Sequence, residues 1–220
     1  MKQTFLLGFI FALFLSATTA QIAPPYWGDI VEFKKMDSIQ QPPAHPILFA
    51  GSSSFTKWTD VNSYFPGYAI INRGFGGSTL LDLIRYAYDV IIPYKPKQVV
   101  IYCGENDLAY SDSVTVAAVV KRFKTLFGII RLNLPEAVIN YVSIKPSPQR
   151  QSIRGKVIET NKEIMLFMKK QRNAGYIDVF SPMLNAAGNP KEYLFLEDSL
   201  HMKPEGYAIW KEIILPYLLR

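Results

Sequence analysis

The segment that decides the fold is Ile47-Leu-Phe-Ala-Gly-Ser-Ser-Ser-Phe-Thr-Lys-Trp58, in which three serines follow a short apolar run. The run at 47–50 has the length and composition of a buried strand, and a helix-like pattern follows the serines. By itself this junction is best explained by a turn and a helix N-cap, because serine is a preferred capping residue. A catalytic nucleophile at the same junction would need partners, which only the rest of the chain can supply.

Four more apolar, β-favouring runs occur along the chain, and helical patterns separate them. The five predicted strands are 47–50, 68–71, 98–103, 138–144 and 176–180. The predicted helices are 27–39, 78–92, 114–132, 154–173 and 204–218, with a Pro-rich connector at 40–46. Strands that alternate with helices indicate a parallel sheet covered on both faces. We therefore expect an α/β protein with three layers, α/β/α, and a five-stranded, doubly wound, flavodoxin-like sheet.

Polar segments follow the predicted strands at the ends where such folds place their functional residues. Three of them, 51–54, 72–79 and 104–107, follow the first three strands, and a fourth, 198–201, lies between the fifth strand and the last helix. Ligands of open parallel sheets bind at the carboxyl ends of the strands. All four segments are expected at this one edge, and their convergence is the strongest physical argument in the sequence.

Of the two histidines, His201 is the better candidate for a general base. His45 lies in the connector before the first strand, at the opposite edge of the sheet, and is expected to be a connector or surface residue. Asp198 precedes His201 by three residues, a spacing that lets the carboxylate reach the imidazole in a turn and orient it. Either residue alone would be explained as a cap or a surface residue. The pair at this edge favours catalysis.

Three groups at the same edge are candidates for stabilising an oxyanion. Gly77 can expose its backbone N–H without a Cβ in the way, and Asn106 can offer its side-chain amide. Ser53 can donate its backbone N–H from the start of the following helix. The alternative explanations are a tight turn at Gly77 and a turn-forming role for Asn106.

The four segments resemble the SGNH (GDSL-type) hydrolases, including their platelet-activating-factor-acetylhydrolase-like branch. The matching blocks are Gly51-Ser-Ser53, similar to Gly-Asp-Ser; Asn72-Arg-Gly-Phe-Gly-Gly77; Gly104-Glu-Asn-Asp107, similar to Gly-x-Asn-Asp; and Asp198-Ser-Leu-His201, similar to Asp-x-x-His. Their order and spacing agree over 47–219. The resemblance implies that Ser53 is the nucleophile. Ser52 stands where the family usually has Asp, a supporting position that affects fine positioning more than the reaction.

The resemblance also implies a serine ester hydrolase that uses no metal and no cofactor. Its catalytic residues would be Ser53, Asp198 and His201, with an oxyanion hole formed by Ser53, Gly77 and Asn106. We expect it to cleave short-chain acyl esters, chiefly acetyl groups on carbohydrates. Two alternatives stay open. One is a lysophospholipase, thioesterase or platelet-activating-factor-acetylhydrolase-like lipid esterase, and the other is a non-catalytic glycan-binding protein on the same fold.

Other functional classes find little support in the residues. Gly74-Phe-Gly-Gly-Ser-Thr79 looks like a dinucleotide-binding loop, but Thr79 replaces the third glycine and the loop follows the second strand instead of the first. The chain has no Gly-x-Ser-x-Gly elbow, and two histidines with the single cysteine, Cys103, make no credible zinc site. The net charge of +6 is modest and no nucleic-acid-binding motif accompanies it.

The first twenty residues have the layout of a secretory signal peptide. Lys2 supplies the positive start, 5–15 is an apolar run, and small residues lead to Ala20. The apolar run is short for a membrane span, which needs roughly 20 residues. We therefore expect cleavage after Ala20, export, and a single hydrolase domain at 21–220. Its partner would be a small-molecule or glycan ester, without nucleic acid and without a stable membrane span after cleavage.

Overall fold

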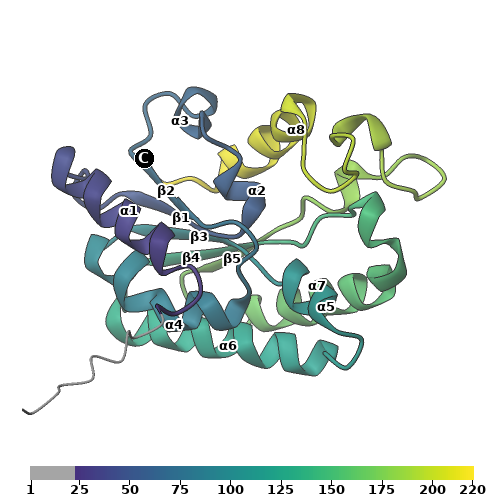
Figure 1. Ribbon diagram of the computed structural model, residues 1–220, viewed down its shortest axis with the longest axis horizontal. Helices are drawn as coiled ribbons and strands as arrows, with labels where there is room; N and C mark the ends of the chain where they lie inside the picture. The colour runs from purple at the N-terminus through teal and green to yellow at the C-terminus, as the bar shows by residue number, and fades with distance from the viewer. Residues whose placement is uncertain (1–22) are drawn as a thin grey trace, which may run out of the picture.

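The computed structural model describes residues 23–220, so the expected signal peptide at 1–20 lies outside the described residues. Five parallel strands form one sheet in the order β2-β1-β3-β4-β5 (Figure 1). Their bounds are β1 Ile47–Gly51, β2 Ile70–Gly74, β3 Gln98–Tyr102, β4 Val138–Val142 and β5 Ala174–Ile177. The expected five-stranded parallel sheet is confirmed, and the strand order is that of flavodoxin-like folds.

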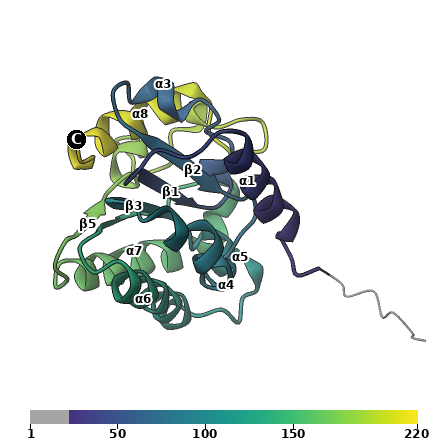
Figure 2. The ribbon, with the colours of Figure 1, turned by 90° about the vertical axis from the view of Figure 1, so that its left-hand side faces the viewer.

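Helices cover both faces of this sheet, as two perpendicular views show (Figures 1 and 2). One face carries α4 (Leu80–Val90), α5 (Glu105–Tyr110), α6 (Val116–Asn133) and α7 (Arg154–Met168). The other carries α2 (Ser53–Thr56), α3 (Val61–Tyr64) and α8 (Pro204–Ile214), while α1 (Trp27–Ile39) packs against α4. Short 3₁₀ segments are η1 (Ile92–Tyr94), η2 (Pro148–Ile153), η3 (Ser181–Met183), η4 (Glu192–Leu194) and η5 (Leu215–Tyr217).

Alternate side chains of the central strands enter two separate hydrophobic cores. In β1, Leu48 and Ala50 join the core beneath α4, α6 and α7, whereas Ile47 and Phe49 join the core beneath α2 and α8. Successive side chains of a strand point to opposite faces of its sheet. A strand covered on both faces is therefore apolar at every position. This explains the continuous apolar run at 47–50 and confirms the three-layer α/β/α architecture.

Two strands lie a few residues away from their predicted positions. The strand expected at 68–71 is Ile70–Gly74, because Asn72 and Gly74 pair with Phe49 and Gly51 of β1 in spite of their polarity or small size. The strand expected at 176–180 is Ala174–Ile177. Beyond it, the backbone N–H groups of Val179 and Phe180 donate to the Ser143 hydroxyl, at 2.9 and 3.0 Å, in place of a strand partner.

Helix ends follow from local chemistry that the periodic pattern does not contain. The helix expected at 78–92 begins at Leu80, because Thr79 and Asp82 form a capping box in which the Thr79 N–H donates to Asp82 at 2.9 Å. The helix expected at 154–173 ends at Met168, and the chain turns through Asn173, which has a left-handed backbone, directly into β5. A capping box thus sets the start of α4, and the turn into β5 sets the end of α7.

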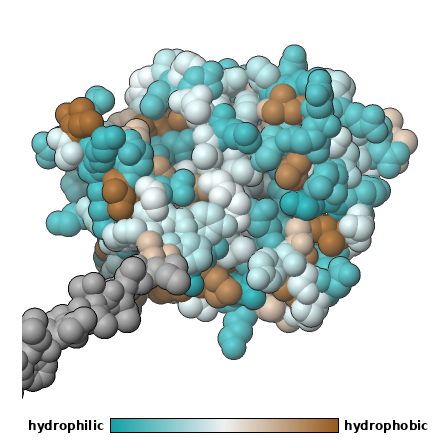
Figure 3. Space-filling view, in the orientation of Figure 1, coloured by the Kyte–Doolittle hydropathy of each residue, from teal (hydrophilic) through white to brown (hydrophobic). Residues whose placement is uncertain are grey.

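The surface in the view of Figure 3 carries apolar side chains scattered among polar ones. No helix within residues 23–220 is both long enough and apolar enough to span a membrane. Cys103, directly after β3, is fully buried and belongs to the core beneath α4 and α6.

Candidate active site

The segment that carries the candidate nucleophile, residues 51–54, leaves the sheet at Gly51, the last residue of β1. A Cβ at Gly51 would lie 2.0 Å from the carbonyl oxygen of Tyr102 in β3, so only glycine fits. The next N–H, that of Ser52, donates to this same carbonyl at 3.0 Å, and α2 starts at Ser53. Ser52 and Ser54 are each only 2% exposed, whereas Ser53 is partly exposed. Burial therefore distinguishes Ser53 from its neighbours, which residue type cannot do.

Asp198 and His201 lie together in the loop between η4 and α8. Asp198 Oδ2 is 2.6 Å from His201 Nδ1, and Asp198 Oδ1 accepts the backbone N–H groups of Leu200 and His201, both at 2.9 Å. Desolvation opposes ionisation of this carboxylate. The hydrogen bonds from the His201 ring and from the two N–H groups outweigh it and lower the pKa of Asp198 to about 2. The carboxylate is thus ionised at any ordinary pH and orients the imidazole through Nδ1.

The loop that carries Asp198 and His201 is held by one hydrogen bond within itself and by another from η2. The N–H of Leu196 donates to the His201 carbonyl at 2.8 Å, and the N–H of Gln149, in η2, donates to the Ser199 carbonyl at 3.0 Å. Ser199 has a left-handed backbone, with φ of 56°. A non-glycine residue in that conformation is held there by its surroundings. The pair therefore has a defined place beside the carboxyl ends of the strands.

The predicted oxyanion donors also meet at this edge. Gly77 has φ of 81°, a conformation that favours glycine, and lies in the loop between β2 and α4. Asn106, in the first turn of α5, donates through Nδ2 to the carbonyl of Ser78 at 3.0 Å. This bond places the Asn106 amide beside Gly77 and leaves its second N–H available to a ligand.

Hydrogen bonds connect the glycine loop, residues 72–79, to the segment of the candidate nucleophile, residues 51–54. The N–H of Phe75 and the hydroxyl of Ser78 both donate to the Gly51 carbonyl, at 2.9 and 3.3 Å. Asn72 Nδ2 donates to the Phe55 carbonyl in α2 at 2.7 Å. The segments at 51–54 and 72–79 consequently form one connected unit.

Asp107 joins α5 to the neighbouring helices by hydrogen bonds. It is fully buried, and its two oxygens accept the Leu80 N–H and a guanidinium N–H of Arg122, both at 2.8 Å. Burial raises the pKa of the Asp107 carboxyl, although the hydrogen bonds from Arg122 and Leu80 oppose the shift. Asp107 thereby ties the start of α5, which carries Asn106, to the start of α4, which follows the loop of Gly77.

Sequence reasoning missed a buried charge pair next to Asn106. Glu105 Oε2 lies 2.6 Å from the ammonium of the fully buried Lys145, and it also accepts the Tyr102 hydroxyl at 2.8 Å. Ser147 donates to the other carboxylate oxygen at 2.5 Å. Burial works against ionisation of Glu105, but these partners, Lys145 above all, hold the pKa of Glu105 below its usual value. A lysine in the polar stretch after β4 gives no local sign that it turns inward.

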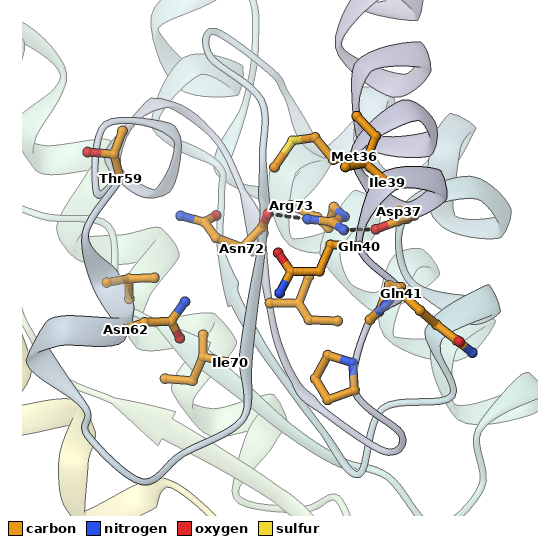
Figure 4. A pocket seen from close by; sticks show the side chains of 14 residues that line it. Met36, Asp37, Ile39, Gln40, Gln41, Thr59, Asn62, Ile70, Asn72 and Arg73 are labelled. Atoms are coloured by element: carbon orange, nitrogen blue, oxygen red, sulfur yellow. Dashed lines mark hydrogen bonds and ion pairs between the residues drawn. The ribbon is translucent and has the colours of Figure 1, made fainter.

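The remaining predicted or prominent features lie apart from this edge. His45 contacts the Lys95 carbonyl through Nδ1 at 3.2 Å, in the connector at the amino-terminal side. A cavity of about 420 Å³ lies between α1, its connector and the edge strand β2, where Asp37 binds Arg73 (Figure 4). None of the five predicted site residues lines it. Within residues 23–220, no three His, Cys, Asp or Glu side chains cluster in a way that would hold a metal ion.

A parallel α/β/α sheet with a serine, a glycine, an asparagine and an Asp–His pair at its carboxyl edge defines an ester hydrolase. The model of the GDSL-like Lipase/Acylhydrolase family matches residues 37–209. The chain therefore belongs to this family and is a carboxylic ester hydrolase. No curated protein sequence matches it.

Solved structures with the same fold come from several bacteria. A GDSL-like lipase from Bacteroides thetaiotaomicron is 19% identical with a TM-score of 0.73, covering 86% of this chain and 96% of its own. A protein from Streptococcus pneumonia, described provisionally as a platelet activating factor, is 20% identical with a TM-score of 0.75 and covers 87% and 92%. The acetylxylan esterase Axe2 from Geobacillus stearothermophilus is 15% identical with a TM-score of 0.63 and covers 80% and 95%. At these identities the likeness concerns the fold.

The buried pair predicts a large loss of stability when one partner is removed. Replacement of Lys145 by Met leaves the Glu105 carboxylate buried without its cation, so we expect the free energy of unfolding to fall by about 3–5 kcal/mol. Denaturant unfolding measures this change. The matched control is Lys35→Met, since Lys35 forms an exposed pair with Glu32 at 3.4 Å. That variant should stay within about 0.5 kcal/mol of the wild type. Equal effects of the two substitutions would contradict a structural role of the buried pair.

Proposed function

We propose that the protein hydrolyses short-chain acyl esters through an acyl-enzyme on Ser53. His201 accepts the Ser53 hydroxyl proton through Nε2 as Ser53 Oγ attacks the ester carbonyl. The N–H groups of Ser53 and Gly77 and the amide of Asn106 stabilise the oxyanion. His201 then protonates the departing alcohol, and water, activated by the same imidazole, releases the acid and restores Ser53.

What supports this assignment most is the accessibility of Ser53 between two buried serines, at the edge that also carries the Asp198–His201 contact of 2.6 Å. Asp198 stays ionised and stabilises the imidazolium that forms when His201 takes the proton. Residues for every role in the reaction are present in the chain. A non-catalytic glycan-binding function would leave this combination without a purpose.

For the substrate we propose acetyl groups on carbohydrates or their fragments. Support comes from the expected export and from the common fold with Axe2, which is an acetylxylan esterase. The second candidate is a lipid ester of the lysophospholipid or platelet-activating-factor type, favoured by the common fold with the protein from Streptococcus pneumonia. We further propose that the signal peptide at 1–20 directs the mature chain out of the cytoplasm, where it would meet either substrate.

Labelling with a small fluorophosphonate tests the nucleophile. We expect one covalent adduct on the wild-type protein, seen by intact mass, and none on Ser53→Ala, because only an activated serine attacks phosphorus at a useful rate. Ser52→Ala and Ser54→Ala are the matched controls and should still be labelled. An adduct that persists on Ser53→Ala but disappears in either control would move the nucleophile to a neighbouring serine.

A second prediction concerns Asp198. Replacement by Asn removes the charge that stabilises the imidazolium, so kcat for an activated ester should fall by roughly 10²- to 10⁴-fold. The pKa of about 2 means that Asp198 itself does not titrate in the working range. An unchanged kcat in Asp198→Asn, with an unchanged melting temperature, would contradict this role.

The two substrate classes can be separated directly. The wild type and Ser53→Ala are incubated with acetylated xylan, acetylated monosaccharides and a lysophospholipid, and the released acid is measured. We expect the wild type to release acetate from the glycans and no fatty acid from the lysophospholipid. Ser53→Ala should release neither. Release of fatty acid alone would establish the lipid alternative.

A further inference from the structure

Tyr26, at the start of α1, has an unusual backbone. It is the N-cap of that helix with φ of 64° and ψ of 5°, the left-handed region that L-residues with large side chains avoid. Strained conformations of this kind persist only where the surroundings impose them, and they cluster at functional sites. The left-handed backbone of Tyr26 must therefore be held by contacts with the surrounding structure.

Several contacts impose this conformation. The Tyr86 hydroxyl, from α4, donates to the Pro25 carbonyl at 2.6 Å, and the Tyr26 carbonyl accepts the Ile30 N–H at 3.2 Å. Trp27 stacks on the ring of Tyr86, with centroids 6.3 Å apart. Ile30 is fully buried in the core beneath α4, α6 and α7. The start of α1 is thus anchored to α4, the same helix that follows the Gly77 loop (Figures 1 and 2).

The side chain of Tyr26 reaches the oxyanion-hole glycine. Its ring packs against Phe75 with centroids 5.5 Å apart. Its hydroxyl and Cε1 lie 3.3 and 3.8 Å from the position that a Cβ on Gly77 would occupy. Tyr26 is partly exposed. An aromatic ring held over this glycine from a distant part of the chain forms a wall of the site.

We propose that the ring of Tyr26 is a specificity-determining element that closes the site beside Gly77 and restricts the acyl group to short chains. The inference rests on the proposed function, since it assumes an acyl carbon whose oxygen is held by the Gly77 N–H. An acyl group so placed lies next to the ring, where acetyl fits and a longer chain meets the ring. The wall is uncharged, because a tyrosine hydroxyl is neutral near pH 7, and burial, followed by the nearby Asp82 and Asp29, raises the pKa of the Tyr26 hydroxyl further.

The test compares p-nitrophenyl acetate, butyrate and octanoate, which share one leaving group and differ only in acyl length. Tyr26→Ala removes the wall. We expect the ratio of kcat/KM for butyrate over acetate to rise by at least about tenfold, since one methylene is worth roughly 10- to 200-fold in an apolar pocket. Tyr26→Phe keeps the ring and should keep the wild-type ratio. Tyr26→Leu retains apolar contact with Phe75 while shortening the side chain, and it should also relax the preference.

Tyr88→Ala is the matched control, because Tyr88 is an exposed tyrosine of α4 that contacts Asn133 and does not touch Gly77. Its ratio should equal that of the wild type. A folded Tyr26→Leu and Tyr26→Ala with wild-type ratios would overturn the inference. That result differs from failure of the proposed function, in which wild-type protein hydrolyses none of the esters or Ser53→Ala remains active and labelled.

Discussion

The close approach of β1 to β3 at Gly51 is the constraint on which the rest of the site depends. The Tyr102 carbonyl occupies the space that a side chain at Gly51 would need, and it accepts the next N–H, that of Ser52. The chain therefore leaves the sheet at one point and in one direction, and α2 starts immediately with Ser53. The Gly51 carbonyl in turn accepts the Phe75 N–H and the Ser78 hydroxyl. One backbone position thus aligns the serine with the glycine loop.

Around this point the site is supported mainly by buried and half-buried polar groups. Asp107 bridges α4 and Arg122, Glu105 binds Lys145, and Asn72 joins the glycine loop to α2. Each of these groups is hydrogen-bonded, and a buried polar group without partners would cost free energy. Such contacts are directional, so they fix angles that apolar packing would leave variable. Asn106, one of the candidate oxyanion donors, is consequently flanked by two acidic residues, Glu105 and Asp107, whose side chains are fixed by ion pairs and hydrogen bonds.

Much of the fold was predictable because its signals are local. The apolar run at 47–50 is buried on both faces, and the helical spacing in 114–132 corresponds closely to α6, Val116–Asn133. The predicted bounds of two strands, β2 and β5, were wrong because tertiary pairing overrides local composition there. Asn72 and Gly74 extend β2 because they pair with β1, while Val179 and Phe180 leave β5 because Ser143 supplies their acceptor. The four polar segments were expected at one edge, and the structure brings them there.

The sequence by itself determined the class of fold, the family, and the residue types available at the carboxyl edge, because periodicity and motif spacing are properties of the chain. Only the tertiary structure decided which of three adjacent serines is accessible, since burial depends on what packs against α2. It also decided that Lys145 turns inward to meet Glu105, and that Tyr26 lies over Gly77 from 51 positions away. The physical reason is the same in each case. Contacts between segments distant in the chain depend on how the layers pack, and no local pattern records that packing.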